Sequence, residues 1–508
     1  MNMRSTLARW TAASDRARAP VVIAVAAALA LGGFVLLLRQ ATGPSASAGP
    51  SPAPADAPLP AAIYSRVVCS FSNGDSRAAL VQGADGGSSL VVGGRAYWLF
   101  GDTLLLPQSG KQIEQNSIAW SDGADTAGCP KLTYYTRDGA AAPFIEKDGS
   151  LTVWPSGAWP DGDGSFDFYT VYIYGSGPYA YWLGEVGVAR LDVRSMRVTP
   201  LARKLWDSTS GFRSQVIGAQ PVEVAGDGLL RVMLETLDHA ELLARVPPGE
   251  IQSPGAYEYW DGGGWSHAPA DAAPLWAPPH SDDPVQRLAS FENGASVAWN
   301  QPLGRYVATV NTGFSLIGVR TAERLEGPWS KPQAWVDCLT FAEAAVPTCY
   351  SPLQHPELSS DGGRRIFVTL TRMQRYDVVG VEITLGTAVH EYRGADGTVA
   401  YAASAPGDGW QDQGIAFQAS DAALPGFVPV YRWQRGPETR YAPDAAAGDF
   451  ERGGVVFYAA PGVSVAGSAT HYRPVYDWSN GTSHLLSTRS SGLEREGYVR
   501  GEAVFYAP

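Results

Sequence analysis

Basic residues are scarce in this sequence of 508 residues. Lys and Arg number 38 against 50 Asp and Glu, and the formal net charge is −12. A protein that binds nucleic acid needs a basic surface to face the phosphates, and one that binds anionic lipid headgroups needs the same. The composition therefore argues against both partners. A neutral partner such as a glycan fits the charge better.

Motifs of several common enzyme classes are also missing. The sequence contains no G-x-S-x-G, no H-E-x-x-H and no P-loop, which argues against serine hydrolases, zinc proteases and P-loop nucleotide hydrolases. It has only four Cys and seven His, and no C-x-x-C supports a zinc site. We expect no cofactor and no catalytic metal. A structural calcium ion stays open, because sites built only from oxygen ligands leave little trace in a sequence.

One long apolar run stands near the N-terminus. The segment VVIAVAAALALGGFVLLL, Val21–Leu38, has 18 uninterrupted apolar or glycine residues and follows Arg4, Arg9, Arg16 and Arg18. Its length suffices to cross a hydrocarbon core of about 30 Å, and the arginines should keep the N-terminus in the cytoplasm. We therefore expect a cytoplasmic tail and membrane anchor over residues 1–39, with the folded part outside the cytoplasm. The alternative is a signal peptide cleaved near SASAGP, which would make the protein secreted.

The part of the chain beyond the anchor begins with a spacer. Residues 40–61 are rich in Pro, Ala and Ser and are expected to be extended. An even number of cysteines outside the cytoplasm suggests disulfides. Cys338 and Cys349 enclose a short loop and are the first predicted pair, which leaves Cys69 with Cys129.

Helical periodicity is hard to find after the spacer. With 57 Gly, 37 Pro, 16 Trp and 23 Tyr, the composition is typical of many short strands joined by turns. From residue 62 to 385, strand hairpins recur in five similar units of roughly 60 residues. The prediction is an all-β fold with a five-bladed β-propeller over residues 62–385, in which each blade buries its faces against its neighbours. A two-sheet sandwich is the rival, and it would need fewer strands.

Residues 386–508 differ from the preceding part and repeat themselves. Three segments share an aromatic residue near each end: Tyr392, Tyr431 and Tyr476 at the front, and Phe417, Phe457 and Phe505 at the back. Three copies of about 40 residues predict a threefold β-trefoil-like module. The segments also resemble short C-terminal repeats of bacterial secreted proteins, with P-V-Y-R followed by E-G-x-A-F-Y. That resemblance implies a separate module and no particular chemistry.

The clearest local pattern is DGGSSLVVGGRAYWLFGD, residues 85–102. Gly93-Gly94 is typical of a two-residue hairpin turn, because glycine accepts the positive φ angles that such turns require. Counting outward from this turn pairs Val92 with Arg95 and, at the end of the ladder, Asp85 with Asp102. Directly opposed residues on antiparallel strands project to the same face, with Cβ atoms roughly 4.5 to 5.5 Å apart.

Like charges in that relation destabilise a sheet, so a purely structural sequence has reason to avoid the pair. In a partly desolvated site, mutual repulsion raises the pKa of one carboxyl while the other stays ionised, as a glycosidase requires. Asp85 and Asp102 are therefore the predicted catalytic residues. Carboxyl groups about 5 to 5.5 Å apart would suit a retaining mechanism and about 6.5 to 9.5 Å an inverting one. The register stays open, because Gly86, Gly87 and Gly101 permit a bulge.

Six residues in later strands and turns are candidates for binding substrate: Asn116, Trp154, Asp167, Glu235, Glu292 and His355. Amide, carboxylate and imidazole groups would hydrogen-bond sugar hydroxyls, and the indole would stack on a sugar ring. Each has a structural alternative. The amide suits a turn, the acids suit a solvated surface, and the aromatic and imidazole rings suit a core.

The motifs DGGSSLVVGGRAYWLFGDT, NSIAW, WPSG, GPWS and HPEL together resemble a family of bacterial propeller proteins, long described as a domain of unknown function, whose characterised members are endo-D-arabinanases. The resemblance spans residues 62–385, and FGDT is its most specific element. It implies glycoside hydrolysis by acidic residues at the propeller mouth, and Asp85 and Asp102 match the family's motif positions. The sequence departs from the pattern at QNSIAW, where a His-Asn is commoner, and in the unmatched insertion 247–288.

These observations predict a glycoside hydrolase acting on an extracellular or cell-envelope polysaccharide, of the arabinan type by resemblance. The C-terminal repeats would hold the polymer near the site. The alternative is a non-catalytic glycan-binding or adhesion protein, whose aspartates bind hydroxyls or a metal ion. An enzyme needs two carboxyls converging across a cleft, whereas a binder needs only an aromatic shelf.

Overall fold

The computed structural model describes residues 61–508 except 115, 123–129, 163, 178–179, 279–291, 314, 342–348, 444–448, 482 and 490. The predicted anchor Val21–Leu38 and nearly all of the predicted spacer lie outside these residues. Within the described part, no helix has the length and apolar character needed to cross a bilayer. Strands dominate this part, and its one α-helix is α2 (Gly74–Ala78), which confirms the all-β prediction.

Five sheets make up the first part of the fold. The first contains β2 (Val81–Val92), β3 (Arg95–Leu105), β5 (Ser117–Asp122) and β6 (Thr133–Tyr134), with β4 (Ile113–Glu114) beside β3. The second contains β9 (Thr152–Pro160), β10 (Ser165–Gly177), β11 (Ala180–Asp192) and β12 (Arg197–Trp206). The third contains β13 (Val216–Val224), β14 (Leu230–Thr236), β15 (Glu241–Val246), β16 (Glu258–Trp260) and β17 (Trp265–Ser266).

The fourth sheet contains β18 (Glu292–Asn300), β19 (Arg305–Thr312), β20 (Leu316–Ala322) and β21 (Gln333–Asp337). The fifth contains β22 (Cys349–Gln354), β23 (Arg365–Arg372), β24 (Asp377–Leu385) and β1 (Ala62–Ser70). A small ribbon of β7 (Thr136–Arg137) and β8 (Ala140–Ala141) stands apart. Short 3₁₀ helices join the strands: η3 (Pro107–Ser109), η4 (Pro248–Glu250), η5 (Pro254–Ala256), η6 (Pro269–Asp271), η7 (Gln301–Leu303), η8 (Cys338–Phe341), η9 (Pro356–Leu358) and η10 (Asp361–Gly363).

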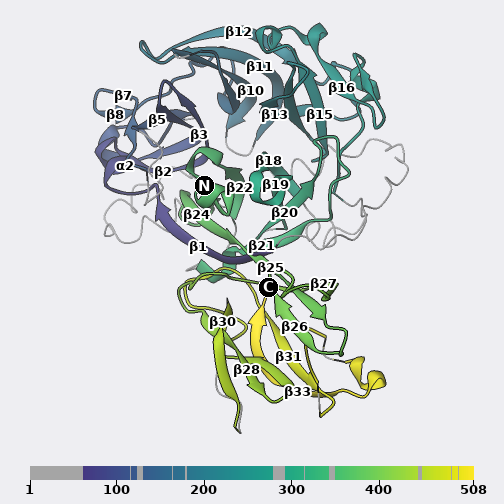
Figure 1. The fold of residues 1–508 in the computed structure, drawn as a ribbon. Helices are drawn as coiled ribbons and strands as arrows, with labels where there is room; N and C mark the ends of the chain where they lie inside the picture. The colour runs from purple at the N-terminus through teal and green to yellow at the C-terminus, as the bar shows by residue number, and fades with distance from the viewer. Residues whose placement is uncertain are drawn as a thin grey trace, which may run out of the picture.

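The first strands of the five sheets form a closed ring. In the order β2, β9, β13, β18 and β22, each touches the next, and β22 touches β2 again. Figure 1 shows the sheets arranged around this common centre. The N-terminal strand β1 pairs with β24, so the two ends of the segment share one sheet and hold the ring shut. The arrangement is propeller-like, and it brings the starts of five strands to one central opening.

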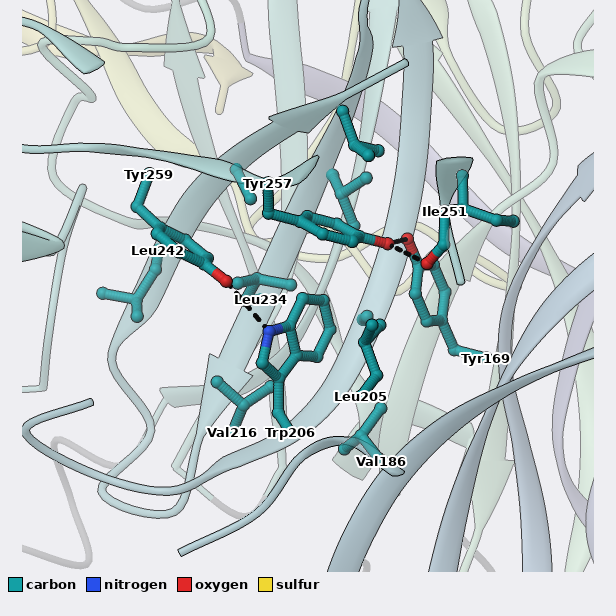
Figure 2. Close-up of a cluster of buried hydrophobic side chains, with 14 of the residues drawn as sticks. Tyr169, Val186, Leu205, Trp206, Val216, Leu234, Leu242, Ile251, Tyr257 and Tyr259 are labelled. Carbon is teal, nitrogen blue, oxygen red and sulfur yellow. Dashed lines mark hydrogen bonds between the residues drawn. The ribbon is translucent and has the colours of Figure 1, made fainter. Parts of the chain in front are cut away.

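Neighbouring sheets pack face to face through large side chains. Figure 2 shows the buried cluster between the second and third sheets, which includes Tyr169, Trp206 and Tyr257. The polar atoms of these rings are paired. The Trp206 Nε1–H donates to the Tyr259 hydroxyl at 3.0 Å, and the Tyr257 hydroxyl donates to the Ile251 carbonyl oxygen at 2.7 Å. Dense cores of this kind keep the inner strands in fixed positions.

The predicted disulfide between Cys338 and Cys349 is present, with a Cα–Cα distance of 6.3 Å. It joins the residue after β21 to the first residue of β22, and so links the fourth sheet to the fifth. Cys69 is also disulfide-bonded. Its predicted partner, Cys129, lies outside the described residues.

The C-terminal residues form three three-stranded sheets. Their strands are β25 (Thr387–Arg393), β26 (Val399–Ala402), β27 (Gln411–Ala419), β28 (Val428–Arg435), β29 (Glu438–Ala442), β30 (Glu451–Ala459), β31 (Arg473–Ser479), β32 (His484–Ser487) and β33 (Val499–Ala507), with η11 (Leu493–Glu496) before β33. Phe417, Phe457 and Phe505 meet at the centre, and each pair of rings is 5.3 Å apart. The predicted match of these three residues is confirmed.

The predicted match at the front of the repeats is wrong by two residues in the first copy. Val389, Val430 and Val475 pair with the three central phenylalanines. Tyr392 therefore corresponds to Trp433 and Trp478, and all three are buried. Aligning the repeats on their tyrosines missed this, because a partly exposed tyrosine, Tyr431 or Tyr476, stands two residues before the buried ring in the second and third copies only.

The C-terminal module is attached to the ring by the segment between β30 and β31. The Ala469 N–H donates to the Ser65 carbonyl oxygen at 2.7 Å, and the Ala469 carbonyl oxygen accepts from the Asp337 N–H at 3.0 Å. The Tyr472 hydroxyl donates to the Ile63 carbonyl oxygen at 2.9 Å. Ala469 belongs to the same buried cluster as the fifth sheet. The module is thus bonded to β1 and to the end of β21, and it lies below the ring in Figure 1.

Candidate active site

The hairpin of β2 and β3 forms as predicted near its turn. Gly93 and Gly94 have φ angles of 58° and 78°, the left-handed region that favours glycine. Val92 pairs with Arg95, and the ladder continues in the predicted register as far as Ser88 and Leu99. Alternate side chains of β3 enter two different buried clusters, so both faces of this strand are buried and the register is strongly specified.

The register breaks at the end of the hairpin that carries the aspartates. It shifts between Gly86 and Ser88 and again between Ala84 and Gly86. Gly86 and Gly87 have φ angles of 75° and 97°, which a strand of ordinary residues would not adopt. Asp85 and Asp102 therefore do not form the predicted regular ladder pair, although Ala84 with Thr103 and Gly83 with Leu104 return to the predicted register beyond them, so both aspartates lie within one irregular stretch. The two consecutive glycines turn the strand out of the ladder.

The same irregularity still brings the two acidic residues together. Gly101 lies beneath the Asp85 carboxylate, and a Cβ atom at position 101 would stand 2.5 Å from Asp85 Oδ1. The backbone N–H of Asp102 hydrogen-bonds to the Asp85 carboxylate. The D-G-G and F-G-D motifs are thus two halves of one structure. The glycines of the first redirect Asp85, and the glycine of the second leaves room for its carboxylate.

A cavity of about 320 Å³ opens beside Asp85 at the centre of the ring. All five sheets contribute to its walls: Asp85 and Ser88 from β2, Trp154 and Ser156 from β9, Gln220 from β13, Glu235 from β14, Glu241 from β15, Ala295 from β18 and Tyr350 from β22. Carboxylate, hydroxyl, amide and indole groups therefore face a space of the size typical of small-ligand sites. Asp85 and Asp102 are partly exposed.

The two aspartates have different hydrogen-bond partners. Asp85 Oδ2 accepts from the Tyr376 hydroxyl at 2.8 Å and from the Tyr350 hydroxyl at 3.1 Å. Asp102 Oδ1 accepts from the Trp154 Nε1–H at 2.9 Å. Four donors, counting the backbone N–H groups of Asp102 and of Asp85 itself, therefore surround the Asp85 carboxylate, whereas among the described residues the Trp154 indole is the one donor to the Asp102 carboxylate. Hydrogen bonds of this kind stabilise the ionised form of a carboxyl.

The different partners give the two carboxyl groups different pKa values. Burial raises the pKa of Asp85, while the hydrogen bonds from Tyr376, Tyr350 and the Asp102 backbone lower it, so that it reaches only about 6. Burial raises the pKa of Asp102 further, the charge of Asp85 adds to the increase, and the Trp154 hydrogen bond offsets part of it, giving about 8. The hydrogen bonds therefore favour the ionised form at Asp85, so a proton shared by the pair is favoured on Asp102.

Comparison with protein families supports the motif interpretation. A family model described as a domain of unknown function, DUF4185, matches residues 71–382. The chain belongs to the DUF4185 family. The match begins after β1 and ends within β24, so it includes the aspartate hairpin and the inner strand of every sheet in the ring. No curated protein matches the chain.

Several solved structures are similar to this DUF4185 protein at low sequence identity. A GH62 α-L-arabinofuranosidase from Coprinopsis cinerea is 11% identical, covering 64% of this chain and 98% of its own, with a TM-score of 0.39. An exo-β-1,3-galactanase from Phanerochaete chrysosporium is 11% identical, covering 84% and 89%, also with a TM-score of 0.39. An α-L-arabinofuranosidase from Clostridium thermocellum is 13% identical, covering 62% and 92%, with a TM-score of 0.36. All three TM-scores are below 0.5, so the case for a function has to come from the site of this chain.

Two of the predicted substrate-binding residues, Trp154 and Glu235, line the cavity at the centre of the ring. Trp154 lines the cavity, and its Nε1–H donates to the Asp102 carboxylate. It therefore contacts a candidate catalytic group and also forms part of the cavity wall. Glu235 is also there, and its Oε1 lies 3.2 Å from His239 Nδ1. Glu241 pairs with Glu235 across the two strands and is itself buried. The third sheet thus adds acidic groups to the cavity.

Asn116 and His355 do not fit the predicted contact with substrate. Asn116 is 2% exposed, and its amide donates to the carbonyl oxygens of Ile145 and Val153 and accepts from two backbone N–H groups. His355 is fully buried; its Nδ1 is 2.5 Å from Ser89 Oγ and its Nε2 is 2.7 Å from Thr369 Oγ1. Both predictions were wrong because these polar groups satisfy buried backbone or hydroxyl partners between sheets.

Asp167 and Glu292 have different outcomes. Asp167 is 4% exposed, and both of its oxygens accept from the Arg190 guanidinium at 2.7 and 2.9 Å. It lies near the start of β10, the second strand of its sheet, and it does not line the cavity, so the substrate role does not fit. Glu292 is the first residue of β18, but its side chain lies outside the described residues.

Sequence reasoning missed Tyr350 and Tyr376. They stand 265 and 291 residues from Asp85, and no local motif marks them. Nor did it place Tyr181, whose ring lies 6.3 Å from that of Trp154 and whose pKa is raised by burial and by the charges of both aspartates. Among the described residues, no group of three or more His, Cys, Asp and Glu is arranged to hold a metal ion.

Proposed function

We propose that the protein is a glycoside hydrolase acting on an extracellular or cell-envelope polysaccharide of the arabinan type. The observation that carries this proposal is the pair Asp85 and Asp102: Asp85 lines the cavity, Asp102 is hydrogen-bonded to Trp154 of the cavity wall, and their different hydrogen-bond partners separate their pKa values. Glycosidases use such a pair. The choice of arabinan rests on the D-G-G and F-G-D-T motifs, which resemble those of endo-D-arabinanases.

The roles follow from the protonation states. Asp102 donates its proton to the glycosidic oxygen as the bond to the anomeric carbon breaks. Asp85, as the carboxylate, stabilises the positive charge that develops on the sugar and accepts the proton of the water that adds to the anomeric carbon. That proton then returns to Asp102. One water is consumed, one glycosidic bond is broken, and the pair ends as it began.

The remaining parts of the proposal concern the setting of the site. We take the five sheets as five blades of a propeller, the three C-terminal sheets as a trefoil-like module, and Val21–Leu38 as the anchor that leaves both outside the cytoplasm. Glu235 is proposed to bind sugar hydroxyls from the wall of the third sheet, where its carboxylate faces the cavity.

A non-catalytic glycan-binding protein explains the site less well. Binding of sugar hydroxyls does not require the pKa values of two neighbouring carboxyls to differ, whereas a hydrolase uses that difference to have one carboxyl donate a proton and the other accept one. The aromatic residues that line the cavity, Trp154 and Tyr350, are each hydrogen-bonded to one of the two aspartates.

The pH dependence of activity tests the assigned roles. Asp85 must be ionised, so kcat/KM should fall as the pH drops below about 6, and Asp102 must be protonated, so it should fall as the pH rises above about 8. We expect a bell-shaped profile with its maximum near neutral pH. A rate that stays constant across both limbs, or that peaks only in strong acid, would contradict the roles.

The substrate is tested with a panel of polysaccharides. The full-length protein in detergent is incubated with arabinan, arabinogalactan, and control glycans that lack arabinose, and new reducing ends are measured. We expect release from the arabinose-containing polymers and none from the controls. New reducing ends from a control glycan alone would support glycoside hydrolysis and contradict arabinan as the substrate. New reducing ends from none of the glycans would contradict the proposed function.

A further inference from the structure

We propose that Tyr376 and Tyr350 are positioning residues that hold Asp85 in its ionised form and in a single orientation. The inference rests on the proposed function for the role of Asp85, and it adds two residues from the opposite end of the ring segment to the machinery. Both belong to the fifth sheet region: Tyr350 is the second residue of β22, and Tyr376 immediately precedes β24.

The contacts are selective for the carboxylate. Both hydroxyls donate to the same atom, Asp85 Oδ2, at 2.8 and 3.1 Å, while the other oxygen lies above Gly101. An ionised carboxylate accepts all of these hydrogen bonds, whereas a protonated one would place an O–H among donors. Burial and the Asp85 charge raise the pKa of each tyrosine well above its ordinary value, so both hydroxyls keep their protons at neutral pH.

The backbone around both tyrosines is held in conformations that non-glycine residues seldom adopt. Tyr376 has a φ of 50°, and Ser351, next to Tyr350, has a φ of 54°. A Cβ atom at Gly83 would stand 1.9 Å from the Tyr376 carbonyl oxygen, so β2 needs a glycine there for the two segments to meet. Such strain persists where the surroundings fix it, and it concentrates at functional sites.

A merely structural role makes a different prediction. Tyrosines that only fill space could be replaced by phenylalanine, since the ring and its packing are kept and only the hydroxyl is lost. Tyrosines that hold the charge of Asp85 cannot. Without one hydroxyl, the carboxylate loses a hydrogen bond to a charged acceptor, one of the stronger kinds, and the proton shared by the pair moves toward Asp85.

The test compares Tyr376→Phe and Tyr350→Phe with Tyr472→Phe, a matched control. Tyr472 is buried, and its hydroxyl makes a 2.9 Å hydrogen bond to the Ile63 carbonyl oxygen, away from the cavity. We expect each site variant to move the acidic limb of the kcat/KM profile upward by about one pH unit, with a roughly tenfold loss on that limb. The control should leave the limb in place. An unmoved limb in both site variants would overturn the inference.

A second readout does not depend on turnover. Infrared titration of protein labelled with carbon-13 aspartate, with the spectrum of Asp85→Asn subtracted, isolates the ionisation of Asp85. Tyr376→Phe should raise the midpoint, and an unchanged midpoint would overturn the inference even if polysaccharide is hydrolysed. If no polysaccharide is hydrolysed but the midpoint moves, the proposed function fails and the effect of the tyrosines on Asp85 stands. Tyr350→Phe supplies the same measurement if Tyr376→Phe does not fold.

Discussion

Replacing Asp102 with asparagine is expected to lower kcat by about 10³-fold, because the amide cannot give a proton to the leaving oxygen. The amide oxygen can still accept from the Trp154 Nε1–H, which donates at 2.9 Å in the native site, so the local geometry should be kept. Steady-state rates on the polysaccharide identified by the panel give the measurement. KM should change little, since the proton transfer is felt in the transition state.

Asp85→Asn should cause a loss of similar size, because the neutral amide removes the negative charge beside the anomeric carbon. Asp122→Asn is the control. Asp122 lies in the same sheet, its side chain is 82% exposed, and it pairs with Arg95 at the surface, so its substitution should leave kcat unchanged. If either site variant retained native activity while remaining folded, that residue would have no part in the chemistry.

Gly101→Ala is expected to lower kcat/KM by about 10²-fold without unfolding the protein. A Cβ atom at this position would stand 2.5 Å from Asp85 Oδ1, closer than any real contact, so the carboxylate has to move. Displacements of about 1 Å in a catalytic group cost losses of this order. The loss should appear in activity first, because the group that shifts is the end of a side chain and not the backbone of a neighbouring strand.

Gly74→Ala is the matched control for this prediction. Gly74 opens the short helix α2, and a Cβ atom there would meet nothing within 4 Å. Its activity and thermal midpoint should match those of the native protein. Native activity in Gly101→Ala would mean that the orientation of Asp85 seen here is not the one used in the reaction.

The part of the site that could be predicted is the hairpin, because its strands and its turn are formed by consecutive residues. Gly93-Gly94 determines a turn, and the ladder beyond it follows by counting until Ser88 and Leu99. Beyond that point, Gly86 and Gly87 allow the chain to leave the regular ladder around Asp85, and the predicted register returns at Ala84 and Thr103. The glycines showed that a bulge was permitted, and its position is accompanied by contacts that no local pattern gives, such as the approach of Gly83 to the Tyr376 carbonyl oxygen.

The remainder of the site depends on contacts distant in sequence. Tyr376 reaches Asp85 from 291 residues away, and a tyrosine beside a strand gives no sign of such a role. The same cause explains the errors at Asn116 and His355. A polar residue in a strand-rich chain can face a cavity or satisfy a buried backbone group, and its neighbours in sequence are alike in both cases. The two-residue error at Tyr392 in the first C-terminal repeat has a local cause. The residue that corresponds to Tyr392 in the other repeats is the buried Trp433 or Trp478, and not the nearby tyrosine.

The most direct test of the central claim is product analysis in water enriched with oxygen-18. The native protein and Asp102→Asn are incubated in parallel with arabinan, and the masses of the fragments are measured by mass spectrometry. Arabinan fragments prepared beforehand are incubated in the same water to measure the exchange of oxygen that occurs without hydrolysis. Hydrolysis at this pair predicts fragments from the native protein that carry one oxygen-18 at the new reducing end, and almost none from the variant. Equal fragment yields from both proteins, or native fragments with no label above the exchange background, would contradict it.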